Sequence, residues 1–257
     1  PHEWDACDSF VRGQSASQQH CSGLVSGRVK ATMVRSDHRR LLVIGLAFVL
    51  LVLMHNAATP VFEAPDEVWH YAYVRWVAEG HGLPALDSDE SGASQQAAQP
   101  PLAYLIAALL SRPFSDDDLA TLLVHNPGFG YQAPGTSADN KNMLIHREPE
   151  RWPWQGTALA VHVTRLVSLG FGLLTILATY GLALEITRRR SWALVGAALV
   201  AFHPQFVFIC SVISNDAAAA ALSTTALWAA VRILRGGINT LSIVLAGVIA
   251  GLAALSK

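Results

Sequence analysis

The sequence predicts an all-α integral membrane protein: a polytopic helix bundle with a large extracytoplasmic first loop that carries interfacial helices. Hydrophobic residues make up 52% of the 257 residues and charged residues only 14%. The mean hydropathy is positive, at +0.34. Five apolar runs also approach or exceed the roughly 20 residues that a membrane-spanning helix needs. This composition is too apolar for an ordinary soluble domain.

The predicted spans cover residues 41–58, 158–187, 191–210, 215–234 and 239–256. The second run is longer than the hydrocarbon core is thick, so it is either tilted or begins outside the bilayer. A cleaved signal peptide is the alternative for the first run, which follows two arginines. A retained helix is favoured there because the run is long and its cleavage site is weak.

Arginines between the runs predict the orientation. They occur before the first run, between the second and third, and after the fourth: Arg39, Arg40, Arg188, Arg189, Arg190, Arg232 and Arg235. The positive-inside rule places all three clusters, and the N-terminus, in the cytoplasm. Residues 59–157 then form one large extracytoplasmic loop.

The two ends of the chain carry different expectations. The N-terminal end is expected to lie outside the fold, and the C-terminal end to belong to a longer membrane domain. Residues 1–38 are read as a cytoplasmic tail without a fold, and Met33 resembles a true start. Residues 39–257 are read as the N-terminal part of a membrane domain. The three cysteines show neither a disulfide framework nor a zinc spacing. A net charge of −1 and the lack of a basic patch give no reason to expect a nucleic-acid partner.

Two helices are predicted inside the large loop, over Pro65–Glu79 and Pro101–Leu110. The stretch between them, "HGLPALDSDESGASQQAAQ", is polar and predicted to be flexible, and residues 115–150 are rich in turn formers. Trp152 and Trp154 suit a membrane interface.

The helix from Pro65 carries an acidic pair whose role is open. Asp66 and Glu67 fall in its first turn, where acids favourably oppose the helix dipole. At 100° per residue, both share an arc with His70, beside an apolar stripe made by Trp69, Ala72, Tyr73 and Trp76. The stripe is expected to rest on the membrane surface or on other helices. The acids are then either solvated helix-start residues, a general base, or oxygen ligands of a divalent cation.

The stretches "PDEVWHYAYVRWVAEGHGLP" and "QPPLAYLIAALL" resemble the GT-C glycosyltransferases. Protein O-mannosyltransferases and lipid A aminoarabinose transferases also have a first transmembrane helix, a loop opening with an acidic pair, and a "PPL" motif before an aromatic residue. The stretches "RWPWQGTALAVHVTRLVS" and "HPQFVFICSVISNDAAAAAL" are similar to an uncharacterised bacterial multi-span membrane family in the same group. Together the matches cover most of residues 41–235.

The resemblance implies catalytic roles for Asp66, as general base or acceptor-orienting carboxylate, and for Glu67 as its partner. His70 is expected to orient Asp66 or to be a plain interface histidine. Arg165 lies near the outer end of the second run, with His162 on the same face. Arg165 is expected either to clamp a carrier phosphate or to extend to the interface.

Further substrate-binding residues are expected at Gln99 and Tyr104, around the "PPL" motif, and at Asn215 and Asp216. The last two also fit a plain helix start after Ser214. Gln99 departs from the family, which places His or Lys before "PPL", so a cation for a phosphate is lacking there. Pro204 is expected to kink the third span.

The expected function is transfer of a sugar, with inversion, from a polyprenyl-phosphate carrier to a hydroxyl of a cell-envelope glycan, lipid or protein. The setting is the outer face of the bacterial cytoplasmic membrane. The partners are this donor, the acceptor and the bilayer; no cofactor is certain, and a divalent cation stays open. The alternative is a non-enzymatic protein for polysaccharide or lipid export or assembly. A transporter is disfavoured because ionisable residues are nearly absent from the first, fourth and fifth runs.

Overall fold

The computed structural model describes residues 37–129 and 142–257, and these are helical with no strand beyond an isolated bridge between His125 and Leu144. The chain divides into two compact units, residues 1–43 and 44–257. Within the described part of the first unit, residues 37–43, Arg40 pairs with Asp37 at 3.5 Å. Most of the predicted tail, with Cys7 and Cys21, lies outside the described residues, as do residues 130–141 of the large loop.

Three predicted spans are confirmed as helices long and apolar enough to cross a membrane, over Asp37–Ala58, Gly156–Thr187 and Asp216–Gly236. The first begins four residues earlier than predicted. The second consists of α5 (Gly156–Thr164) and α6 (Leu166–Thr187), which meet at Arg165, and the third is α9 (Asp216–Gly236).

The other two predicted spans are shorter than expected. The run 191–210 is not one helix but α7 (Arg190–Ala201) and α8 (Pro204–Ile209). Proline removes a backbone donor and disfavours helical geometry in the residue before it. His203 is accordingly extended, with ψ 119°, and Pro204 starts a new helix instead of kinking the old one. The fifth run forms α10 (Thr240–Ala254), of 15 residues.

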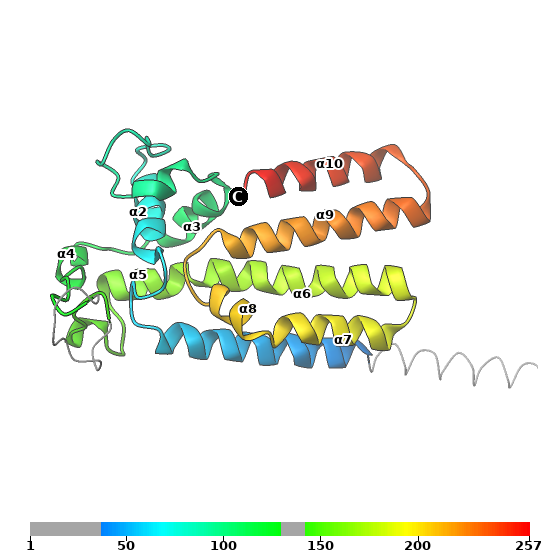
Figure 1. The fold of residues 1–257 in the computed structure, drawn as a ribbon, viewed down its shortest axis with the longest axis horizontal. Coiled ribbons are helices and arrows are strands. Elements are labelled where there is room, and N and C mark those ends of the chain that lie inside the picture. Colours follow the sequence, from blue (N-terminus) through cyan, green and yellow to red (C-terminus); the bar gives the residue numbers. More distant parts are fainter. Residues whose placement is uncertain (1–36, 130–141) are drawn as a thin grey trace, which may run out of the picture. The chain divides into compact units, whose positions relative to one another are not determined.

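Helices α6, α7, α9 and α10 run side by side in the second unit (Figure 1). Helix α6 is central: it packs against α7 and α9, and α10 packs on α9. Their outward faces carry exposed large apolar residues, among them Leu177, Leu199, Leu241 and Val248. Such a surface suits lipid better than water.

The large loop forms a packed body, called here the cap (residues 59–129 and 142–155). It contains α2 (Glu67–Ala78), η1 (Ser94–Ala98), α3 (Leu102–Ser111), α4 (Leu119–Leu122) and η2 (Glu148–Glu150). The two predicted loop helices are thus confirmed as α2 and α3, which pack against each other and lie beside one end of α6 (Figure 1). A buried cluster joins the cap to α5 through residues that include Phe62, Tyr104, Leu122, Leu144 and Val161.

The buried face of α2 differs from the predicted one. The buried residues are Glu67, His70, Tyr71, Tyr73 and Val74. Of the predicted stripe, Tyr73 is buried and stacks on Tyr104 of α3, whereas Trp69, Ala72 and Trp76 are half-exposed. The expectation that the stripe rests on another helix is met at Tyr73. The burial of the polar face was not expected; hydrogen-bond partners hold Glu67 and His70 inside.

Helices α6 and α9 approach closely at Gly181. A Cβ at this position would lie 2.4 Å from the Trp228 ring, whereas a Cβ at Gly170 on the same helix would meet nothing within 4 Å. Alanine normally stabilises a helix relative to glycine by about 1 kcal/mol, but overpacking costs about 1–3 kcal/mol.

We therefore predict that Gly181→Ala lowers the free energy of unfolding and Gly170→Ala does not. Thermal unfolding of both variants in the same detergent provides the measurement. Equal stability of the two variants would contradict the α6–α9 contact.

Candidate active site

Glu67 is a fully buried carboxylate with four hydrogen-bond donors around it. Its Oε1 accepts from Arg165 Nε at 2.8 Å and from the Ile213 backbone N–H at 2.9 Å. Its Oε2 accepts from Arg165 Nη2 at 2.7 Å and from the Phe62 N–H at 3.2 Å. A carboxylate has about four acceptor positions, so these bonds use its full capacity.

Arg165 is equally enclosed, with no exposed surface. Besides the two bonds to Glu67, its Nη1 donates to the carbonyls of Asn56 and Thr59, each at 2.9 Å, and its Nη2 to that of Pro60 at 3.1 Å. A guanidinium has five N–H donors, and all five are engaged. Neither predicted role for Arg165, phosphate clamp or interface residue, fits this geometry.

His162 extends the same buried network from α5. Its Nδ1 lies 2.7 Å from Asn56 Oδ1, and Asn56 Nδ2 donates to the His162 carbonyl at 3.1 Å. The Trp154 ring stacks on the imidazole with centroids 3.7 Å apart. His162 and Arg165 do share a face, as predicted, and both contact Asn56. These partners hold His162 as a packing residue of the network.

Asp66, one residue before Glu67, has the opposite environment: it is exposed. It occupies the N-cap position of α2, yet its side chain makes no capping hydrogen bond. Within the described residues, no hydrogen bond or ion pair engages its carboxylate. Asp66 thus fits the expected solvated acid at the helix start, although it makes no capping hydrogen bond. Its role as general base stays a prediction. Of the two adjacent acids, Glu67 is buried with four partners and Asp66 is exposed with none.

The backbone of Asp66 is left-handed, with φ 60° and ψ 4°. Residues other than glycine seldom adopt this conformation, although Asp and Asn tolerate it better than most. Such conformations cost about 1–3 kcal/mol and cluster at functional sites. The turn points the two neighbouring carboxylates in different directions, one into the protein and one into solvent.

His70 and Tyr104 join α2 to α3 beside Asp66. His70 Nδ1 lies 2.8 Å from the Tyr104 hydroxyl, and Tyr104 stacks on Tyr73 with centroids 3.9 Å apart. Burial lowers the pKa of His70, against the opposing charges of Asp66 and Asp216. Burial likewise raises the pKa of Tyr104. A neutral imidazole can accept the hydrogen bond that the phenol donates.

Asn215 and Asp216 reach the same region from the start of α9. Asn215 Nδ2 donates to Gln99 Oε1 at 3.2 Å, and Asp216 pairs with Lys257. The charges of Asp216 and Lys257 both act on His70. The structure thus gathers six of the predicted residues at one place: Asp66, His70, Gln99, Tyr104, Asn215 and Asp216. We call this group the Asp66 site.

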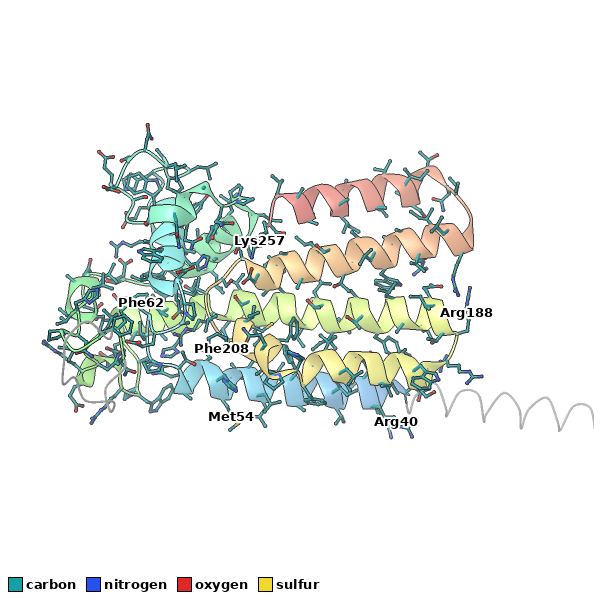
Figure 2. All side chains as sticks on the ribbon, in the orientation of Figure 1. Arg40, Met54, Phe62, Arg188, Phe208 and Lys257 are labelled. Atoms are coloured by element: carbon teal, nitrogen blue, oxygen red, sulfur yellow. The ribbon has the colours of Figure 1, made fainter. Side chains whose placement is uncertain are left out.

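Glu67, His162 and Arg165 do not belong to the Asp66 site. Glu67 and Arg165 use all their polar side-chain atoms inside the protein, and His162 is held by Asn56 and Trp154. Sequence reasoning missed Lys257, which lies at the end of the last apolar run, beside the cap (Figure 2). It also missed Asn56, whose polar side chain within the first apolar run was the available signal. Among the described residues, no group of three or more His, Cys, Asp or Glu side chains is placed to hold a metal ion.

The Glu67–Arg165 pair is predicted to be structural. Removing one partner strands a buried charge and costs about 3–5 kcal/mol, whereas removing both costs far less than the sum of the single changes. We expect Glu67→Gln and Arg165→Met each to unfold the protein at much lower denaturant or temperature, and the double variant to recover part of the loss.

The matched control is the partly exposed Arg75–Glu79 ion pair, in which Arg75 Nη2 lies 2.7 Å from Glu79 Oε1. Glu79→Gln should change the free energy of unfolding by less than about 1 kcal/mol. Additive effects of Glu67→Gln and Arg165→Met in the double variant would show that the buried pair does not form.

His70 is predicted to make the protein acid-sensitive. Because its pKa is lower in the folded state than its ordinary value of 6.5, the unfolded chain binds more protons as the pH falls below 6.5, and stability falls with it. We expect His70→Gln, which can still bond Tyr104, to lose less stability than the parent between about pH 7 and 5. Identical pH profiles of unfolding would contradict this assignment.

The chain matches no protein-family model, no curated protein and no solved structure. The likeness to GT-C glycosyltransferases therefore rests on the acidic pair, the "PPL" motif and their order along the chain, and stays a prediction.

Proposed function

We propose that this chain forms part of a GT-C-type glycosyltransferase that moves a sugar from a polyprenyl-phosphate carrier to a hydroxyl of a cell-envelope glycan, lipid or protein. The observation that carries the proposal is the exposed, unpartnered Asp66 carboxylate, whose charge acts on His70 and Tyr104. A general base needs a free carboxylate that can reach the proton it removes. Of the two acids in the motif, only Asp66 meets that condition.

In the proposed reaction, Asp66 accepts the proton of the acceptor hydroxyl as its oxygen attacks the anomeric carbon of the sugar. The bond from that carbon to the phosphate oxygen breaks on the opposite side, so the configuration inverts, and polyprenyl phosphate leaves. Asn215 and Gln99 offer amide groups to sugar hydroxyls. Lys257 supplies positive charge for the departing phosphate, a role that Arg165 cannot fill while its five donors are engaged.

The proposed setting is the outer face of a bacterial cytoplasmic membrane. Arg235 donates to the carbonyls of Glu185 and Ile186, so the arginines after α6 and α9 gather at one end of the bundle. Phe62, in the cap, and Arg188 lie at opposite ends of α6 (Figure 2), which at 22 residues is about 33 Å long. The positive-inside rule then assigns the cap to the outside, with α7 and α8 together as a crossing interrupted at Pro204.

We expect Asp66→Asn to lower sugar transfer by about 10²–10⁴-fold without lowering the free energy of unfolding. Asparagine tolerates the left-handed backbone as aspartate does, so the variant tests the carboxylate alone. Transfer from a labelled polyprenyl-phosphate sugar, in membranes holding the full-length protein, provides the measurement.

The control is Asp87→Asn, which alters another exposed acid of the cap and should leave transfer unchanged. Unaltered transfer and unaltered envelope glycan in Asp66→Asn would count against the enzyme and in favour of an export or assembly protein.

A further inference from the structure

A second cleft lies on the flank of α2 that faces away from the Glu67–Arg165 pair. Its volume is about 390 Å³. Trp69, Ala72 and Trp76 line it from α2, and residues 89–92 line it from the loop opposite. At 100° per residue, these three positions lie about 140–200° around the helix from Glu67, and the lining of the cleft shares no residue with the Asp66 site. The cleft is therefore separate from the Asp66 site, and an assignment for it does not depend on the proposed glycosyl transfer.

Two indole rings form walls of this cleft, which we call the tryptophan cleft. Trp69 and Trp76 are seven residues apart, about two helical turns. Between them, Gly92 adopts φ +65°, and a Cβ on it would lie 3.7 Å from the Ala72 Cβ. The loop backbone thus crosses α2 at Ala72, where glycine permits both the conformation and the close approach. Trp69, Ala72 and Trp76 of the predicted stripe thus line a concave surface, whereas Tyr73 packs on α3.

The charges at the tryptophan cleft are unbalanced. Its lining holds one guanidinium, Arg75, and three carboxylates, those of Glu79, Asp89 and Glu90. Glu79 is paired with Arg75 at 2.7 Å, and Asp116 engages the same guanidinium. Asp89 and Glu90 are exposed, and no ion pair within the described residues neutralises them. Two uncompensated carboxylates therefore flank the aromatic walls.

One polar group in the wall also lacks a partner. Trp76 Nε1 is buried and has no hydrogen-bond partner among the described residues. The ring contacts His81, with centroids 4.4 Å apart. Because Nε1 has almost no exposed surface, the Trp76 ring offers the cleft apolar surface and no accessible hydrogen-bond donor.

We propose that the tryptophan cleft binds a small organic cation of the ammonium class. Indole faces attract cations through the ring quadrupole, and Asp89 and Glu90 supply the opposing charge. An anion would be repelled by the two carboxylates, and a neutral ligand would leave their charge uncompensated.

The first test compares choline with 3,3-dimethylbutan-1-ol, a neutral molecule of nearly the same shape. Both are titrated into the full chain in lipid nanodiscs, with binding followed by calorimetry. We expect saturable binding of choline and at least about tenfold weaker binding of the alcohol. Absent choline binding, or equal affinities for the two, would overturn the proposal.

The second test places the binding in this cleft. The Asp89→Asn/Glu90→Gln double variant changes exposed loop residues and should fold like the parent, with choline bound about tenfold more weakly. Trp76→Leu, which keeps both carboxylates, should weaken binding as well. The control, Asp87→Asn/Glu148→Gln, removes two exposed acids outside the cleft lining and should bind like the parent. Unchanged affinity in the first double variant, or an equal loss in the control, would overturn the assignment.

Discussion

The buried ion pair between Glu67 and Arg165 is the interaction on which the rest of the structure depends. Burying two charges costs several kcal/mol per ion unless each is fully hydrogen-bonded, and here every donor and acceptor of the pair is engaged. The partners come from four places in the chain: the end of the first apolar helix, the start of α2, the junction of α5 and α6, and the turn before α9. One guanidinium and one carboxylate thus fix where the cap meets the helices.

This constraint separates the roles of the acidic pair. Glu67 is held inside the protein. The left-handed turn at Asp66 directs the Asp66 carboxylate outward, beside His70, Tyr104 and the start of α9. The same α2 helix therefore supports the Asp66 site at its beginning, a structural ion pair on its buried face, and the tryptophan cleft on its opposite flank. Glu67 is not a solvated helix-start acid, because it is buried and fully hydrogen-bonded, whereas Asp66 is solvated at the N-cap position of α2.

Sequence reasoning predicted what depends on local composition. The three long apolar helices, α2 and α3 follow from hydropathy, helix-start residues and periodicity. It failed where distant residues decide the outcome. Glu67 and Arg165 are 98 residues apart, so no local pattern could reveal that they neutralise each other or that the polar face of α2 is buried. Pro204 was predicted to kink one continuous helix, whereas the structure has two separate helices, α7 and α8, on either side of the break.

The central claim, that Asp66 is exposed and Glu67 is not, can be measured directly by carboxyl footprinting. The protein in nanodiscs is treated with a water-soluble carbodiimide and an amine, and tandem mass spectrometry locates the label within the peptide that holds both acids. The account predicts labelling at Asp66 and protection at Glu67 until the protein is denatured. Equal labelling of the two carboxylates in the folded protein would contradict it.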